Sequence, residues 1–400
     1  MAANASSHSS DKILQDLDSI SADGFASDAD RYKALLAAYH LVARLETPWD
    51  TVTRLCMTQP ALGASLKVAK DLKLFEKWHE RGGLAESTTD LAALVDCDPQ
   101  LLARLLRHIA SNHMLEEVSA DVFRPSAFAT SLLQPAYGEW INYLYDTSLP
   151  CSYKMPEYLQ KTGYMEPADP RDGIHQYTKG YKGDVWQYHT DNPREGASFN
   201  RGLGGKMAHQ ASWVNIVPLT PLLDGADESQ PLLVDVGGNI GHDLDKFRAV
   251  YPDKDALLYL QDTAAVIKST KCPDTVNKMV HDFFQPQPIK GRVTFQPVIA
   301  YDTETILHDW PDASAHQILS SIRGALRPGY SRLLIHEHVL PDTGAPPHAT
   351  SFDLLMMMFL SGKERSEGQW RILLGSAGLK VVRIWRSPLA NQAVLEAELA

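Results

Sequence analysis

The pattern of hydrophobic and polar positions changes character along the chain and predicts two kinds of structure. Up to about residue 117, apolar residues recur at spacings of three and four, as in RYKALLAAYHLVARL and ALGASLKVAKDLKLFEKW, which is typical of amphipathic helices. After about residue 216, short apolar runs alternate with amphipathic segments. Strands separated by helices of roughly ten to fifteen residues indicate a doubly wound α/β sheet.

The N-terminal part predicts a tail and a helical domain. Residues 1–28 are rich in Ser, Ala and Asp, so we expect a flexible tail with one short helix around Lys12 to Leu17. In residues 29–130, Ser87 begins a helix at LAALV, Asp98 begins the next at QLLARLLRHIASN, and HMLEEV with VFRPS predicts a small hairpin. Helix, helix and hairpin in this order are typical of a winged helix.

The remaining residues predict a connection followed by the α/β domain. Residues 131–215 contain many Pro, Gly and Tyr residues, which indicates a long irregular connection with short helices, of the kind that often lines a binding pocket. Residues 216–400 contain the alternating strands and helices. The predicted strands lie in PLLVDVG, ALLYLQD, MVHDFF, the segment before LHDWPD, and SRLLIHEHV.

Charge and composition limit the classes of partner. The formal net charge of −11 disfavours nucleic acid, because binding to phosphates depends on clustered Lys and Arg. The start MAANASSHSSDKILQ has no basic leader or apolar region, and no run approaches the roughly 18 apolar residues that span a bilayer. We therefore expect a cytoplasmic protein without membrane contact. Reduced structural thiols and no metal site are expected from the four cysteines, which have no paired spacing: Cys56, Cys97, Cys151 and Cys272.

Three successive strand ends carry residues that suit a nucleoside. The first strand runs into a tight turn that contains Gly237 and Gly238, and glycine lets the backbone approach a ligand at the carboxyl end of a strand. Asp262 ends the next strand, where a carboxylate can bind both hydroxyls of a ribose. Asp282 and Phe283 follow the third, and an acid beside an aromatic ring suits an adenine amino group and face. The ordinary alternatives are a structural strand-helix corner and, for Asp282, a helix N-cap.

The motifs at these strand ends resemble one enzyme family. LVDVGGNIGHD, QD, HDFF, LHDWPD, LLIHEHVLPD and GKERSEGQW resemble, in order and spacing, the plant caffeate-type O-methyltransferases, and MPEYLQKTGYMEPADPRDGIHQY is similar to their fungal branch, which methylates polyketides and other aromatic secondary metabolites. The resemblance covers roughly residues 30 to 400. It implies a Rossmann-like domain that binds S-adenosylmethionine, an N-terminal winged-helix domain that forms a homodimer, and a small aromatic or polyketide-like acceptor.

The resemblance also implies a general base. His308 lies in ILHDWPD, where we expect it to end a strand at the ligand-binding edge, and Glu337 and Glu364 match the family's two acids beside this histidine. An ordinary imidazole is about 3.5 pKa units below a phenol, a gap of roughly 5 kcal/mol. A carboxylate beside the imidazole makes it more basic and fixes its tautomer. Without the resemblance, His308 is a structural histidine and Glu364 a solvated acid in a charged run.

The candidate acceptor pocket involves an apolar stripe from Phe352 to Phe359. In the family this helix supplies pocket walls, and an adaptable methionine suits a flat aromatic acceptor. Met356 and Phe359 are therefore the expected pocket residues. The alternative is that the stripe belongs to the hydrophobic core.

Several positions depart from the family's pattern. The segment between Gly291 and His308 is longer than in the family, and Glu304 stands four positions before the histidine, where the family has a basic residue that contacts the cofactor. Thr263 begins a Thr-Ala pair in place of the family's Leu-Pro, and Asn239 replaces a glycine. Asn tolerates a left-handed backbone better than most residues, so the last change is mild.

Two other functions stay open at the level of sequence. The fold and cofactor could serve a non-methylating cyclisation or rearrangement, because a fold does not determine a function. A winged-helix DNA-binding regulator would use the helix at residues 100–112, which carries Arg104, Arg107 and His108 but is crowded with Leu in an acidic chain. An NAD-dependent reductase is disfavoured because GxGxxG is absent from the turn.

Overall fold

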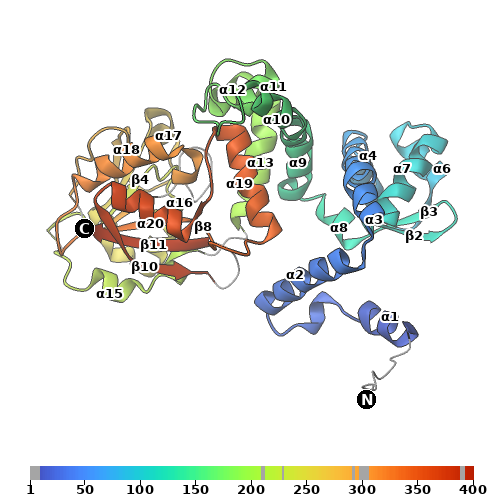
Figure 1. Cartoon of the computed structure of the whole chain (residues 1–400), viewed down its shortest axis with the longest axis horizontal. Helices are drawn as coiled ribbons and strands as arrows, with labels where there is room; N and C mark the ends of the chain where they lie inside the picture. Colours follow the sequence, from blue (N-terminus) through green and yellow to red (C-terminus); the bar gives the residue numbers. More distant parts are fainter. Residues whose placement is uncertain (1–9, 209–211, 228, 291–292, 297–305, 388–391) are drawn as a thin grey trace. The chain divides into compact units, whose positions relative to one another are not determined.

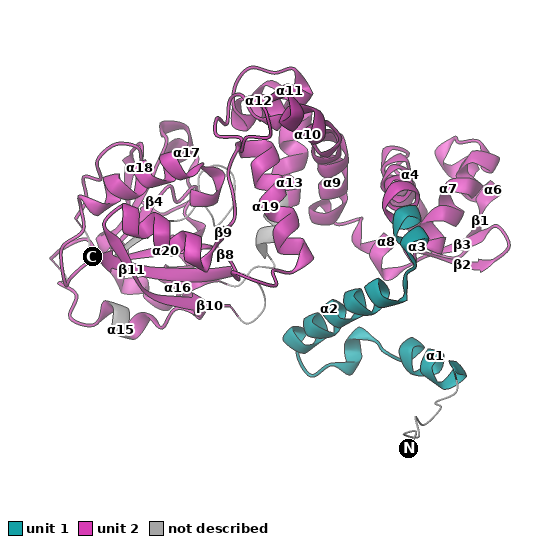
Figure 2. Cartoon of the chain, in the orientation of Figure 1, with its two compact units in different colours: residues 1–54 teal, residues 55–400 magenta. Residues whose placement is uncertain are grey.

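The chain divides into two compact units, residues 1–54 and residues 55–400 (Figure 2). The division falls within the domain expected at residues 29–130, whose limits stay a prediction. No helix in the described part of the chain is long and apolar enough to cross a membrane. Glu304 and most of the insertion before His308 lie outside the described residues. The computed structural model describes residues 10–208, 212–227, 229–290, 293–296, 306–387 and 392–400.

Two helices of the first unit begin with a side-chain N-cap. Ser27 accepts a hydrogen bond from the backbone N–H of Asp30, and Thr47 and Asp50 form a capping box before Pro48, so orphan N–H groups are satisfied at both starts. Among the described residues, these helices bury no side chain. The elements are α1 (Ser10–Asp18), η1 (Ala22–Gly24), α2 (Asp28–Leu45) and α3 (Pro48–Thr53).

The second unit begins with a small helical module that has the expected order of helix, helix and hairpin. Ser87 caps α6 and Asp98 caps α7, as the sequence predicts, and the strands form an antiparallel sheet in the order β1-β3-β2. Trp78 and Phe123 are fully buried in its core. The elements are η2 (Arg54–Thr58), α4 (Gln59–Asp71), α5 (Leu74–Glu80), β1 (Glu86–Ser87), α6 (Thr88–Val95), α7 (Pro99–Ser111), β2 (Leu115–Ser119) and β3 (Val122–Pro125).

Helix α7 is engaged within this module. Leu102, Leu106 and Ile109 are buried in the module's core. On the polar side, Arg107 pairs with Asp121 at 2.9 Å. The helix therefore uses its apolar face for packing, and one of the basic side chains considered for DNA binding already has a carboxylate partner.

The segment after the module is more helical than expected. The sequence predicts an irregular connection, but α9, η3 and α10 follow one another directly, because Tyr143, Cys151 and Tyr158 are buried in one apolar cluster. Pro135 and Pro150 stand in first turns, where a missing N–H costs little. The elements are α8 (Ala127–Ser131), α9 (Pro135–Tyr143), η3 (Leu144–Ser148), α10 (Leu149–Lys161), α11 (Ile174–Lys179), α12 (Val185–Asp191) and α13 (Pro193–Ala208).

The C-terminal part is built on an eight-stranded sheet in the order β10-β11-β8-β7-β4-β5-β6, with β9 pairing with β8. Strands β6, β5, β4, β7 and β8 are parallel, and β11 is antiparallel to both β8 and β10. The strands are β4 (Leu233–Val236), β5 (Leu258–Asp262), β6 (Asn277–Val280), β7 (Val293–Gln296), β8 (Arg332–Leu340), β9 (Arg365–Ser366), β10 (Leu379–Arg386) and β11 (Gln392–Leu399).

Helices cover both faces of this sheet (Figure 1). Because successive side chains of a strand point to opposite faces, Val234 and Val236 belong to the apolar cluster that contains residues of α18 and α20, whereas Leu233 belongs to the cluster with α14 and α16. The doubly wound α/β prediction is therefore confirmed. The helices are α14 (Trp213–Ile216), α15 (Leu219–Leu223), α16 (His242–Val250), η4 (Pro252–Leu257), α17 (Ala264–Ser269), η5 (Leu307–Asp309), α18 (Asp312–Arg323), α19 (Pro347–Leu360) and α20 (Glu367–Ser376).

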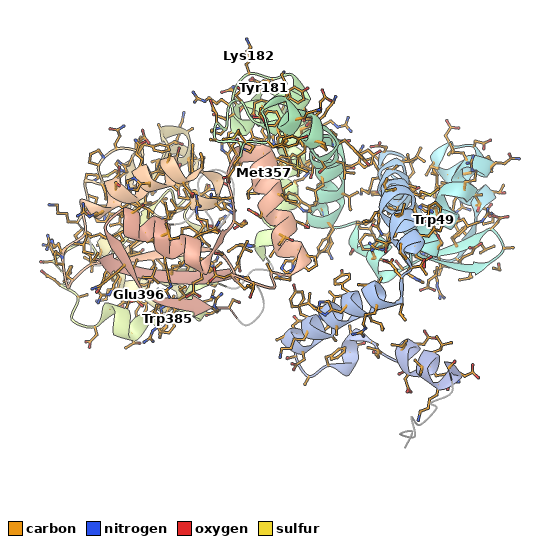
Figure 3. The ribbon with its side chains drawn as sticks, viewed as in Figure 1. Trp49, Tyr181, Lys182, Met357, Trp385 and Glu396 are labelled. Carbon is orange, nitrogen blue, oxygen red and sulfur yellow. The ribbon has the colours of Figure 1, made fainter. Side chains whose placement is uncertain are left out.

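The C-terminal hairpin is an addition to the predicted pattern. Strands β10 and β11 were not among the expected elements, and they extend the sheet beyond β8. On these two strands, Nε1 of Trp385 donates a hydrogen bond to Oε2 of Glu396 at 3.0 Å (Figure 3). A cross-strand pair of this kind stabilises a hairpin.

Candidate active site

The carboxyl ends of β4, β5 and β6 open into one cavity of about 340 Å³, a size typical of ligand sites. Four of the residues expected to bind the cofactor line it, namely Gly237, Asp262, Asp282 and Phe283. Sequence reasoning did not assign the other residues to this site. They are Thr263, Val280, His281, Phe284 and Trp310.

The glycine turn after β4 has a left-handed backbone at several positions. Gly237 has a φ of 77° and Asn239 a φ of 51°, so the asparagine does adopt the conformation that it tolerates. Gly238 is not among the described residues that line the cavity. A Cβ atom there would lie 2.3 Å from the carboxyl group of Asp235, so glycine is required for space behind the turn.

Asp262 holds two backbone segments together at the edge of the cavity. Its Oδ2 accepts a hydrogen bond from the backbone N–H of Asn239 at 2.9 Å, and its Oδ1 accepts one from Thr263 at 2.6 Å. The side chain is only 2% exposed, and burial raises its pKa although the two backbone hydrogen bonds lower it. A carboxylate offers about four lone-pair sites, so Asp262 retains capacity to accept hydrogen bonds from hydroxyl groups in the cavity.

Asp282 and Phe283 contribute different features. Oδ1 of Asp282 accepts a hydrogen bond from the backbone N–H of Phe284 at 2.9 Å, but in the described part of the chain no helix begins here, so the helix N-cap considered from the sequence is not formed. Phe283 is buried, and Phe284 packs against both Phe283 and Trp310 with ring centroids 5.0 Å apart in each pair. One wall of the cavity is therefore aromatic.

The lining of this cavity combines polar and aromatic side chains, which suits a polar ligand with an aromatic part. His281 lines the cavity, and its Nε2 is buried without a hydrogen-bond partner among the described residues. Such groups are costly unless a ligand or water completes them. Hydrogen-bonding groups beside an aromatic wall fit a nucleoside, which has a ribose, a purine and a polar tail.

A second, narrower cavity of about 50 Å³ contains the expected acceptor residues. His308, Met356 and Phe359 all line it, as does Asp309. The rest of its wall comes from α9, α12, α13 and α19 and is rich in aromatic rings: Trp140, Tyr143, Val185, Trp186, His189, Phe199, Phe352, Leu355 and Leu360.

His308 lies in the one-turn helix η5 and does not end a strand, so that expectation is wrong. The backbone N–H groups of Leu307 and His308 donate to Oε1 of Glu337, at 2.7 and 3.3 Å, instead of to a neighbouring strand. Arg365 completes the turn, because its guanidinium donates to the carbonyl groups of Leu307 and Trp310 at 2.7 and 2.8 Å. Two side chains therefore hold the backbone that carries the imidazole.

The imidazole of His308 lies among three carboxyl groups. Nδ1 is 2.7 Å from Oε1 of Glu364 and 3.9 Å from Oε2 of Glu337, and Nε2 is 3.1 Å from Oδ1 of Asp309. Burial by itself lowers the pKa of His308, but the charges of Glu364, Asp309 and Glu337 raise it well above its usual value. The pKa of Glu337 is raised to about 8, mainly by burial.

Among the described residues, His308, Glu337 and Glu364 form a group whose donor atoms could hold a metal ion. Donor atoms of His308, Glu337 and Glu364 lie within 4.8 Å of one another. The contact of 2.7 Å between Nδ1 and Glu364 has the length of a charge-assisted hydrogen bond.

Glu364 and Arg365 are buried within the charged run, so the interpretation of Glu364 as a solvated acid is wrong. Glu364 is 3% exposed and Arg365 is 0% exposed, because β9 pairs with β8 inside the site. The backbone N–H of Glu364 donates to Asp353 at 2.9 Å, and that of Lys363 donates to the carbonyl of His308 at 2.8 Å. Sequence reasoning missed the roles of Asp309, Asp353 and Arg365, and only the position of Asp309 directly after the histidine was a signal.

Residues 308–310 border both cavities. His308 and Asp309 line the narrow aromatic cavity, whereas Trp310 lines the larger one. Ligands bound in the two cavities would therefore both lie beside this short segment, and direct transfer between two bound molecules requires such proximity.

Comparison with known proteins identifies the family. The O-methyltransferase domain family matches residues 166–380, and the O-methyltransferase dimerisation domain matches residues 55–135. The O-methyltransferase mfmE of Annulohypoxylon moriforme is 54% identical, over 97% of this chain and 95% of its own length. Two solved structures, described as a pericyclic reaction enzyme and as LepI in complex with SAM, are each 26% identical over 98% of both chains, with TM-scores of 0.82 and 0.81. The chain therefore belongs to the O-methyltransferase family and is an O-methyltransferase that uses S-adenosylmethionine as its cofactor.

Proposed function

We propose that this enzyme methylates a phenolic hydroxyl group of a small aromatic, polyketide-like secondary metabolite, with His308 as the general base. One observation carries the proposal: His308 faces the aromatic cavity while Glu364 holds its Nδ1 at 2.7 Å. The identity of 54% to the O-methyltransferase mfmE supports the same class of reaction. Gly237, Asp262, Asp282 and Phe283 are the proposed contacts of the cofactor, and Gly238 supports the turn.

The proposed mechanism uses both nitrogens of His308. When bound, S-adenosylmethionine supplies a methyl group on a positively charged sulfur. Glu364 accepts the Nδ1–H of His308 and so leaves Nε2 to take the proton of the acceptor hydroxyl. Nearby carboxylates stabilise the imidazolium that results. Oδ1 of Asp309 lies 3.1 Å from Nε2. The Asp309 side chain must therefore move away before the acceptor hydroxyl can contact this nitrogen.

Glu337 is proposed to position the base. Its Oε1 holds the backbone N–H groups of Leu307 and His308. Its Oε2 is 3.9 Å from Nδ1 of His308, whereas Glu364 is 2.7 Å from Nδ1 and Asp309 is 3.1 Å from Nε2. The closer partners of the imidazole are therefore Glu364 and Asp309, and Glu337 fixes the turn.

The size of the acceptor cavity adds a requirement. Its volume of about 50 Å³ is below the roughly 300 to 1,000 Å³ of most ligand sites. An aromatic acceptor therefore needs side chains of the wall to move. Met356 is suited to this, because its unbranched side chain adopts many conformations.

The test is a direct assay of methyl transfer. We expect the purified enzyme, given S-adenosylmethionine and a panel of hydroxylated aromatic compounds, to form S-adenosylhomocysteine together with an acceptor that gains one methyl group. Mass spectrometry of both products, with and without each acceptor, measures this. Formation of neither product with any phenol would contradict the proposal.

A non-methylating reaction is a second candidate. It is favoured by the similarity, at a TM-score of 0.82, to a structure described as a pericyclic reaction enzyme. In that case the enzyme would convert its substrate to an isomer of unchanged mass without forming S-adenosylhomocysteine. The histidine with carboxylates on both ring nitrogens favours methyl transfer instead, because it is a proton acceptor beside the acceptor cavity.

We also propose a homodimer. The match to the dimerisation domain at residues 55–135 supports it, as does α2, which exposes Leu35, Tyr39 and Val42 at helical spacing. Leu62 and Leu66, also considered from the sequence, are instead buried in the core of their own module. Sedimentation should give twice the chain mass for the wild type and less for Val42→Asp, whereas Lys33→Glu should behave like the wild type. A wild-type monomer at high concentration would refute the dimer.

A further inference from the structure

A polar pair in the aromatic wall of the acceptor cavity has no part in the proposed proton transfer. Tyr143 of α9 and His189 of α12 both line the cavity that contains His308. Oη of Tyr143 lies 3.0 Å from Nε2 of His189. Most other residues of this wall are apolar, so these two side chains decide which polar groups an acceptor can carry at that position.

The hydrogen bond couples the tautomer of His189 to the direction in which the Tyr143 hydroxyl donates. Tyr143 is 1% exposed, and a buried hydroxyl has one proton to donate. Among the described residues, Nε2 of His189 is its hydrogen-bond partner. If Tyr143 donates, Nε2 accepts, and a neutral imidazole then carries its proton on Nδ1.

The imidazole is also held neutral and in a fixed plane. Burial lowers the pKa of His189 to about 4, so the ring is uncharged at neutral pH. Its face stacks on Phe199 with centroids 4.7 Å apart, and Tyr143 contacts it edge-on at 5.5 Å. The structure gives no hydrogen-bond partner for Nδ1 among the described residues. With Nε2 as the acceptor from Tyr143, the wall of the cavity carries an N–H donor on Nδ1, and its partner must come from the ligand or from water.

We infer that the Nδ1–H of His189 donates a hydrogen bond to a carbonyl oxygen of the acceptor, so that the enzyme selects hydroxylated aromatic ketones or quinones. This inference rests on the proposed function, because it takes the narrow cavity as the acceptor site. A carbonyl oxygen accepts hydrogen bonds but donates none. It therefore suits the Nδ1–H of His189, which donates and needs only an acceptor. A site built around such a donor favours the substrate that completes the hydrogen bond over the analogue that lacks the oxygen.

The first test compares acceptors that differ in the carbonyl group alone. The probes are the hydroxy-1-tetralones, with the hydroxyl at each ring position, and the tetrahydronaphthols of the same shape. For each probe, kcat/KM is measured for the wild type and for His189→Phe, which keeps an aromatic ring but lacks the donor. For each probe, kcat/KM of the wild type is divided by kcat/KM of His189→Phe. This ratio removes the effect of the phenol's own acidity, because both enzymes act on the same compound.

We expect this ratio to be about three- to tenfold for at least one hydroxytetralone, the size of one neutral hydrogen bond, and close to one for the tetrahydronaphthols. His189→Gln, which retains an N–H, should recover part of the loss. His316→Gln serves as the control, because His316 lies on α18 outside the cavity and contacts the carbonyl of Ser376. Equal ratios for both classes of probe would overturn the inference and leave His189 a packing residue.

A second test does not depend on turnover. In ¹⁵N-histidine-labelled wild-type enzyme, the nitrogen shifts of His189, assigned by their loss in His189→Phe, should show the proton on Nδ1. The Nδ1 signal should shift when a hydroxytetralone is added to the complex with S-adenosylhomocysteine. A proton on Nε2, or no shift at saturating probe, would overturn the inference. Absence of methyl transfer to every probe, with the expected tautomer and shift, would contradict the proposed reaction but not the recognition of a carbonyl.

Discussion

Oδ1 of Asp309 lies 3.1 Å from Nε2 of His308, the nitrogen that takes the proton of the acceptor in the proposed reaction. Because Glu364 holds the other ring nitrogen at 2.7 Å, the imidazole lies between two carboxylates. Burial opposes a charge on the ring, but the carboxylates outweigh it and raise the pKa of His308. The resting site therefore stabilises the imidazolium, and the neutral base becomes available as the pH rises through this raised pKa.

Replacing Asp309 should shift the pH dependence. The rate on a weakly acidic phenol should rise with pH through the pKa of His308, because the neutral ring is the base. Asp309→Asn removes one negative charge beside the ring and should move this midpoint to lower pH by about one unit or more. Profiles of kcat/KM against pH measure the shift. Asp274→Asn, at an exposed site paired with Lys278, should leave the midpoint unchanged, and an unchanged midpoint for Asp309→Asn would argue against its charge as a cause.

Removing the base should slow turnover and leave cofactor binding intact. His308→Gln should reduce kcat by about 10² to 10⁴-fold, the usual range for a lost general base. The affinity for S-adenosylhomocysteine, measured by calorimetry, should stay close to that of the wild type, because His308 lines the other cavity. A nitrophenol that is already ionised should partly rescue the variant. If His308→Gln were as active as the wild type on every acceptor, another group would have to take the proton.

The two glutamates should act through the same imidazole. Glu364→Gln and Glu337→Gln should each reduce kcat by roughly ten- to hundredfold, less than the loss of the base itself. Combined with His308→Gln, either change should add little, since groups that act as a unit are not additive. Rates of the single and double variants, together with thermal unfolding to detect damage to the η5 turn, test this. Fully multiplicative losses would show that the glutamates act independently of His308.

Asp262 should control cofactor affinity. We expect the wild type to bind S-adenosylhomocysteine with micromolar affinity and Asp262→Ala to bind it without measurable heat in calorimetry. Asp262→Asn is the matched variant, because it keeps one oxygen for the hydrogen bonds from the N–H groups of Asn239 or Thr263 while it lacks the charge. Retained affinity in Asp262→Ala would mean that this carboxylate serves the two backbone turns and not the ligand.

Much of the fold follows from local patterns. The caps at Ser87 and Asp98, the hairpin after α7 and the parallel strands β4, β5 and β8 were all expected from the sequence. These features depend on the period of apolar residues and on short-range hydrogen bonds, which a sequence displays directly. The hairpin of β10 and β11 and the continuous run of α9, η3 and α10 were not expected, because long-range packing stabilises both.

The candidate site was only partly visible in the sequence. Motif resemblance located His308, Glu337 and Glu364, and the structure brings their side chains together. It did not reveal that Arg365, in a run of charged residues, is fully buried and holds the turn of His308 by its carbonyl groups. A buried charge depends on partners from distant segments, and no local pattern encodes them.

By itself, the sequence determined the fold class and the family, because hydrophobic period, caps and motif spacing are properties of neighbouring residues. Tertiary structure alone decided the surroundings of the proposed base. It put Asp309 on one nitrogen of His308 and Glu364, 56 positions away, on the other. It also joined Tyr143 to His189 in the wall of the acceptor cavity. These distances set the pKa values and tautomers of the site, and they exist only when separate elements are folded against one another.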